Sequence, residues 1–147
     1  MADEQKLFTL REAERARQEI EPLLIDAMEA RREASELQSS LARLAARVMM
    51  AGGLLVRYEE AARKRATLDK LQQRIESALD QIHSTGCVVK DLDSGLLDFP
   101  AVLDNQEVYL CWRLGEDRIR YYHGIKEGFA GRKPLDPHDR GPSRPIQ

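Results

Sequence analysis

The sequence has few aromatic residues, no excess of one charge and no long apolar run. Its 147 residues include three Phe, one Trp and four Tyr, and its 25 acidic and 23 basic side chains leave a net charge of −2. This balance removes the positive field on which non-specific nucleic-acid binding depends, so we expect no nucleic-acid partner. The longest uncharged apolar run, residues 48–56, is too short for a membrane span, which needs about 20 residues in a helix, so we expect no membrane association.

Cysteine is equally scarce, since Cys87 and Cys111 are the two thiols. Neither a disulfide framework nor a secretion signal is indicated, because the polar start MADEQK has no apolar core and no small-residue cleavage site. We therefore expect a reduced, cytoplasmic protein. No motif with a known catalytic mechanism is present, so the sequence names neither a substrate nor a reaction.

Charged and helix-forming residues are abundant, and a chain that is 33% charged and 42% hydrophobic is typical of a folded protein with long helices. Thr9 and Glu12 form a capping box, in which each side chain accepts a hydrogen bond from an otherwise unpaired backbone N–H. Phe8 occupies the preceding staple position. Because proline favours the first turn of a helix, we predict a short helix to about Ile20 and a long one restarting at Pro22; a single proline-kinked helix is the alternative.

Two long periodic segments on either side of Gly52 and Gly53 predict a helical hairpin. The first carries nine apolar residues at steps of three and four: Ile20, Leu23, Ala27, Ala30, Ala34, Leu37, Leu41, Leu44 and Val48. The second carries Leu55, Tyr58, Ala62, Leu68, Leu71, Ile75, Ala78, Leu79 and Ile82. Adjacent glycines cost roughly 1 kcal/mol each inside a helix, so we place the turn there, and Gly86 is the expected left-handed cap of the second helix.

The pairing of the two helices follows from folding the chain back at the glycines. Leu37 then faces Leu68, while Ala34 faces Leu71, Ala30 faces Ile75 and Ala27 lies near Leu79. Small residues thus face large ones, as two closely packed antiparallel helices require.

After Gly86 the pattern changes to that of β-structure. Residues 87–91, a turn at 93–95 and residues 95–99 predict a short hairpin that stops at Pro100.

A second, longer hairpin is predicted from residues 107–113 and 118–123. A loop of two or four residues gives one apolar face that consists of Val108, Leu110, Trp112, Ile119, Tyr121 and His123. Cys111 then points to the opposite face. A three-residue loop, the alternative, would set Trp112 opposite Arg120 and spoil the apolar face.

These elements predict an α+β fold: a long antiparallel helical hairpin, with a short N-terminal helix, plus a small antiparallel sheet of about four strands. The expected boundaries are a single domain over residues 1–135, with the hairpin at 9–84, the sheet at 86–124 and a loop at 125–135, and a mobile tail over 136–147.

Most of the chemically capable residues gather in the last hairpin and in the glycine-rich segment that follows it. The candidate ligand-binding residues are Arg113, Glu116, His123 and Arg132. The two arginines would hold an anionic group, with Glu116 and His123 as polar or acid–base partners. In the structural alternative, Glu116 closes a turn, His123 ends a strand and the arginines pair with acidic helical faces. We name no catalytic residue, because neither a nucleophile–base spacing nor a phosphate loop is present.

A zinc site could be assembled from His83, Cys87, Cys111 and His123. No Cys-x-x-Cys or His-x-x-x-His spacing supports it, and the predicted register separates Cys111 from His123. We therefore expect no metal and no cofactor.

The predicted end of the hairpin is apolar, although such an end usually faces water. The candidate interface residues are Met28, Met49, Leu54 and Leu55. A small sheet would also leave a second apolar stripe of the first helix uncovered, which consists of Leu24, Met28, Ala42, Ala45 and Met49. We therefore expect a homodimer, and burial of the tip between the two helices is the alternative.

Three stretches of the chain resemble one known family: FTLREAE near the start, GLLDFPA in the middle and EVYLCWRLGEDRIRYYHGIKEGFAGRKPL near the end. They are similar to the bacterial domain-of-unknown-function family 2203 over roughly residues 6–135. The resemblance implies a small prokaryotic protein with a helical N-terminal part, a C-terminal β part and no established activity. Cys87 lies outside the family pattern, which further weakens the zinc hypothesis.

Two functional hypotheses follow. The first is an uncharacterised, non-catalytic interaction or scaffold protein that self-associates through its helical hairpin. The alternative is a small anionic-ligand-binding protein or enzyme with a pocket at the sheet end.

Overall fold

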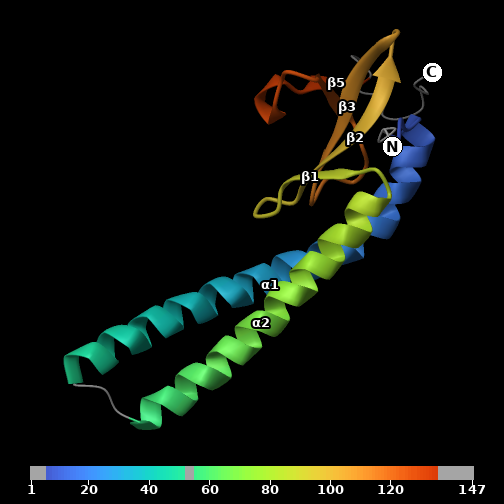
Figure 1. Ribbon diagram of the computed structural model, residues 1–147. Coiled ribbons are helices and arrows are strands. Elements are labelled where there is room, and N and C mark those ends of the chain that lie inside the picture. The colour runs from blue at the N-terminus through green and yellow to red at the C-terminus, as the bar shows by residue number, and fades with distance from the viewer. Residues whose placement is uncertain (1–5, 52–54, 136–147) are drawn as a thin grey trace, which may run out of the picture. The chain divides into compact units, whose positions relative to one another are not determined.

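The computed structural model describes residues 6–51 and 55–135 of the chain. They form helices α1 (Leu10–Ala51) and α2 (Leu55–Ser84) and the strands β1 (Val88–Asp91), β2 (Leu96–Leu103), β3 (Gln106–Arg113), β4 (Tyr121–Gly124) and β5 (Lys133–Pro134), with a 3₁₀ turn η1 (Phe129–Gly131) before β5 (Figure 1). The strands are antiparallel and lie in chain order. The predicted α+β fold of a helical hairpin and an antiparallel sheet is confirmed. No helix within the described ranges has the length and apolarity to cross a membrane.

The chain divides into two compact units. One contains the residues up to Ile25 together with those from Leu79 onward, and it includes the sheet. The other, Asp26–Ala78, consists of the two long helical arms. The predicted turn at Gly52 and Gly53 lies outside the described residues.

Helix α1 begins at the predicted capping box. The backbone N–H of Thr9 donates to Glu12 Oε1 at 3.0 Å, and the N–H of Glu12 donates to Thr9 Oγ1 at 3.1 Å. The predicted break near Ile20 is wrong, because α1 continues through Pro22 as a single helix. An interior proline costs about 3 kcal/mol. Ile20 and Leu24, which flank it, are fully buried, and each such burial contributes about 1.5–3 kcal/mol.

The helical arms pack as the sequence predicts. Ala30, Ala34 and Leu71 form a buried cluster, and the partly buried Leu37, Leu68 and Ile75 pack against it. Arg74 joins the arms from the outside, since its guanidinium donates to both carboxylate oxygens of Asp26 at 2.5–3.1 Å. The small-to-large pairing therefore sets the register of the two arms.

Strand β2 is longer than predicted, because it continues through Pro100 to Leu103. The pairing of β1 with β2 extends only to Asp98, so Pro100 lies beyond it on this edge of β2. Proline has no backbone N–H, and at this position no hydrogen bond between the strands requires one. Its carbonyl oxygen accepts a hydrogen bond from the backbone N–H of Phe8 at 2.7 Å.

The predicted register of β3 with β4 is wrong. Cys111 pairs with Tyr121, and Tyr109 pairs with His123. This is the register of the alternative with a three-residue loop, which sets Trp112 opposite Arg120. Residues 114–120 leave the sheet, so β4 begins at Tyr121 and not near residue 118. Tertiary contacts fix this segment, because Ile119 is fully buried and its N–H donates to Glu14 Oε1 of α1 at 2.7 Å.

The predicted loop over residues 125–135 contains the 3₁₀ turn η1 and the short strand β5, which pairs with β4. The sheet therefore has five strands where about four were predicted. The two residue pairs of β5, Tyr121 with Pro134 and Tyr122 with Lys133, are too few to leave a periodic signal in the sequence.

The sheet has two different faces. On one, Phe99 packs edge-on against Phe8 at a ring-centroid distance of 5.3 Å, and Trp112 lies 5.4 Å from the guanidinium of Arg17 in α1. Leu97, Leu110 and Trp112 of this face are fully buried. Because side chains alternate along a strand, the neighbouring residues point to the other face, which we call the site face and which carries Asp98, Tyr109, Cys111, Tyr121 and His123.

Candidate functional site

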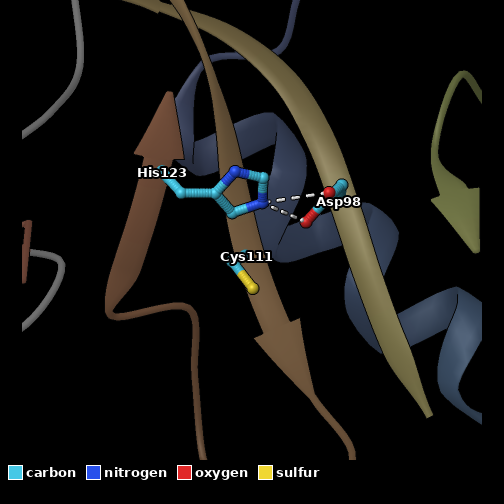
Figure 2. Close-up of side chains that lie close together, drawn as sticks. All are labelled: Asp98, Cys111 and His123. Carbon is cyan, nitrogen blue, oxygen red and sulfur yellow. Dashed lines mark hydrogen bonds and ion pairs between the residues drawn. The ribbon is translucent and has the colours of Figure 1, made fainter. Parts of the chain in front are cut away.

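The site face brings together three polar side chains from three adjacent strands. Asp98 of β2 pairs directly with Cys111 of β3, and Cys111 pairs with Tyr121 of β4, two residues before His123. Figure 2 shows the His123 ring and the Asp98 carboxylate pointing toward one another, with the Cys111 sulfur beside them. Three rigid strands therefore position this group.

Within this group, His123 and Asp98 form a buried pair. His123 Nε2 lies 3.1 Å from Oδ1 and 3.0 Å from Oδ2 of Asp98 (Figure 2). The other ring nitrogen, Nδ1, lies 2.9 Å from the carbonyl oxygen of Gly124. One ligand atom from each of Asp98, Cys111 and His123 can be chosen so that all lie within 4.8 Å of one another. The residues are 0%, 0% and 2% exposed, so the group is closed to solvent within the described structure.

Burial dominates the electrostatics of this group. It raises the pKa of the Asp98 carboxyl above its ordinary value, although the charges of His123 and Lys90 act in the opposite direction. Burial, together with the negative charge of Asp98, raises the pKa of the Cys111 thiol to about 12. Without a bound cation Cys111 is therefore a protonated thiol at neutral pH and a poor nucleophile.

A second cluster contains three of the four predicted ligand-binding residues. Arg132 donates to Glu116 Oε2 at 2.6 Å, and Glu116 Oε1 accepts from the backbone N–H of Arg113 at 2.8 Å. The Arg132 guanidinium lies 4.1 Å from the ring centroid of Tyr121 and 4.4 Å from that of Phe129. Glu116 thus closes a turn, as in the structural alternative, and also pairs with Arg132.

His123, the fourth predicted residue, pairs with Asp98. The two clusters are nevertheless neighbours, because Tyr121, whose ring centroid lies 4.1 Å from the Arg132 guanidinium, pairs with Cys111. Among the other residues of the zinc hypothesis, Cys87 is a buried free thiol and His83 is exposed on α2. Neither belongs to the Asp98–Cys111–His123 group.

Sequence reasoning did not find Asp98. The sequence did carry a signal for it. Asp98 lies between Leu97 and Phe99, and the other residues of this strand are all apolar. Aspartate is rarely buried without a partner, so its position predicts one. That partner lies 25 residues away on a strand whose predicted register was wrong.

The predicted interface residues fall mainly in the helical arms. Met49 is exposed and Met28 is half-buried, whereas the side chain of Leu55 and all of Leu54 lie outside the described structure. The predicted uncovered stripe is wrong at Leu24, which is fully buried because α1 belongs to the sheet-containing unit as far as Ile25. Ala42 and Ala45 of that stripe are exposed.

A family model described as "Uncharacterized conserved protein (DUF2203)" matches residues 6–135. No curated protein and no solved structure matches the chain significantly.

Proposed function

The chain belongs to the DUF2203 family of uncharacterized conserved proteins, and we propose that it is a non-catalytic interaction protein that self-associates through its helical arms. The observation that carries this proposal is the exposure of large apolar side chains near the ends of both arms. Met49 is 83% exposed, Met50 is 89% exposed and Tyr58 is 70% exposed. Burying a methionine side chain contributes about 1.5–3 kcal/mol, so covering these residues offsets part of the cost of association with a partner.

The surface beside Met49 is suited to close helix contact. Ala42, Ala45 and Ala46 precede Met49 at helical spacing on α1, and all of them are exposed. Small side chains let a second helix approach closely, while Met49 fills the gap beside them.

The charge pattern of the arms favours a second copy of the chain as the partner. Residues 26–36 carry four acidic and two basic side chains, whereas residues 43–70 carry seven basic and three acidic ones. In a two-fold symmetric pair with antiparallel arms, each acidic segment meets the basic segment of the other copy. The same chain thus supplies both halves of a complementary interface.

Sedimentation equilibrium tests the proposal directly. We expect the wild-type chain to have the mass of a dimer at micromolar concentration, and the double variant Met49→Glu/Met50→Glu to shift toward monomer. Gln72→Glu/Gln73→Glu is the matched control, because it adds the same charge at exposed positions of the arms and should leave the mass unchanged. A wild-type monomer across the micromolar range contradicts the proposal.

The second cluster supports an alternative function, the binding of a small anionic ligand. Within the described residues, Nε of Arg132 is buried without a hydrogen-bond partner, and Arg113 is exposed nearby over the Phe129 ring at 5.8 Å. A thermal-shift screen of phosphates, nucleotides and small carboxylates tests it. A ligand at 100 times its dissociation constant stabilises by about 2.7 kcal/mol, and Arg113→Ala should abolish that gain. The absence of any stabiliser removes this alternative.

The cellular compartment follows from the thiols. Cys87 and Cys111 are both free, which suits a reducing environment, and we place the protein in the cytoplasm on this ground.

A further inference from the structure

We propose that Asp98, Cys111 and His123 form a binding site for a divalent transition-metal ion, and that Zn²⁺ is the ion it fits best. The site lies on the sheet and does not depend on self-association through the helical arms. It also differs from the predicted set of His83, Cys87, Cys111 and His123, of which it keeps only Cys111 and His123.

The spacing of the donor atoms suits a zinc ion. Zinc binds nitrogen, oxygen and sulfur at about 2.0–2.3 Å, so two ligand atoms of a tetrahedral site lie roughly 3–4 Å apart. His123 Nε2 lies 3.0 and 3.1 Å from the two oxygens of Asp98, and the Cys111 sulfur completes a group whose atoms are all within 4.8 Å. The limit of 4.8 Å lies somewhat above this range, so a bound ion would draw the three donors closer together.

The hydrogen bonding of His123 points the same way. A carbonyl oxygen only accepts, so Nδ1 carries a proton and donates it to Gly124 at 2.9 Å. In the neutral ring Nε2 is then an acceptor, and it faces two carboxylate oxygens that are also acceptors. This arrangement requires a proton or a metal cation between them. A histidine that donates one ring N–H to a carbonyl and directs the other nitrogen into the site is the usual arrangement of a metal ligand.

The charge of the donor set matches a divalent ion. An Asp98 carboxylate and a Cys111 thiolate carry two negative charges, and neutral His123 adds none. A bound Zn²⁺ therefore gives a neutral group, which is what a fully buried site requires. Metal binding releases the thiol proton of Cys111 and the proton held between His123 and Asp98 to solvent.

The identity of the donors selects the metal. A thiolate and an imidazole suit Zn²⁺ and other late transition ions, whereas Mg²⁺ and Ca²⁺ prefer sites made of oxygen alone. The position on three paired strands holds the donors in place before the ion arrives. Such a site would tie β2, β3 and β4 together across the sheet.

The first experiment uses Co²⁺ as a spectroscopic probe on the full chain, purified without a histidine tag and stripped of metal under reducing conditions. We expect Co²⁺ to produce a thiolate-to-cobalt charge-transfer band in the near ultraviolet and the intense visible bands of a four-coordinate ion, in which Asp98 ligates through both of its oxygens. Added Zn²⁺ should abolish both. Since the wild-type chain is used, the result does not depend on the folding of any variant, and the absence of a thiolate band overturns the proposal.

The second experiment assigns the ligands by competition with a chromophoric zinc chelator. We expect about one zinc ion per chain for the wild type. Cys111→Ser and His123→Gln should each weaken binding by more than the roughly 10–100-fold that loss of an outer hydrogen bond causes. Circular dichroism of the metal-free variants shows whether they are folded.

Matched controls come from the residues that the structure leaves out of the group. Cys87→Ala removes the other buried thiol and His83→Ala removes an exposed imidazole, and both should bind zinc as the wild type does. Wild-type affinity in folded Cys111→Ser, or an equal loss in Cys87→Ala, overturns the assignment. A monomeric chain that binds zinc would contradict the proposed self-association alone, and a dimer that binds no zinc would contradict only the metal site.

Discussion

Asp98 occupies surroundings that are unusual for an aspartate. It is a fully buried carboxyl in the middle of a strand, and His123 and Cys111 surround it. The pair of Asp98 and His123 is stable because each polar group satisfies the other. Removing one partner therefore costs more than the pair itself contributes.

At this scale we predict that Asp98→Ala lowers the free energy of unfolding of the metal-free protein by about 3–5 kcal/mol, because it leaves Nε2 of the buried His123 ring without a partner. Urea denaturation measures the loss. Asp80→Ala, at an exposed position of α2, is the control and should change stability by less than about 0.5 kcal/mol. Equal losses in the two variants would mean that the buried pair of Asp98 and His123 makes no specific contribution to the free energy of unfolding.

At the scale of elements, the two helical arms depend on a narrow seam. Ala30 and Ala34 of α1 leave room for Leu71 of α2, and this contact is the buried centre of the arms. Because the seam is narrow, each large side chain within it carries a sizeable share of the packing energy.

We predict that Leu71→Ala destabilises the protein by about 2–5 kcal/mol, since the small residues opposite it cannot fill the cavity. Thermal or urea unfolding followed by helical circular dichroism provides the measurement. The neighbouring Lys70 is exposed, so Lys70→Ala is a matched truncation that should cost little. A small loss for Leu71→Ala would place the seam elsewhere on α2.

The ion pair between the arms predicts a pH dependence. The hydrogen bond from Arg74 holds the pKa of Asp26 below its ordinary value. The pair therefore stabilises the fold above the pKa of Asp26 in the unfolded chain, about 3.9, and the stabilisation is lost as the pH falls through the lower folded value.

Accordingly, the melting temperature of the wild type should exceed that of Asp26→Asn at neutral pH, and the difference should shrink as the pH falls below about 4. Glu76→Gln, at an exposed position of α2, is the charge-matched control and should show a smaller change. A difference that stays constant across this range would exclude a charged role for Asp26.

At the scale of the whole molecule, self-association links stability to protein concentration. A dimer that forms only from folded chains is stabilised by mass action, so its melting temperature rises with concentration. We predict this rise for the wild type and its loss in Met49→Glu/Met50→Glu. Differential scanning calorimetry over a roughly hundredfold concentration range is the measurement. A concentration-independent wild type would contradict a dimer of folded chains.

The sequence by itself determined the elements whose signals are local. The capping box of Thr9 and Glu12 and the heptad-like seam depend on residues that are close in sequence. The small-to-large pairing of the arms depends on residues that a single reversal of the chain between the two helices brings together. A helix satisfies its backbone hydrogen bonds within one segment, so its periodicity is sufficient to predict it.

Only the tertiary structure decided the continuity of α1 through Pro22, the register of β3 with β4, the fifth strand and the neighbours of Asp98. Burial of Ile20 and Leu24 maintains the helix across the proline, and Glu14 of α1 fixes the backbone at Ile119 before β4 begins. A shift of one residue in a strand exchanges its two faces, so this distant contact determined whether His123 faces the core or Asp98. The candidate site depends on that choice, and nothing within the local sequence of β3 and β4 specifies it.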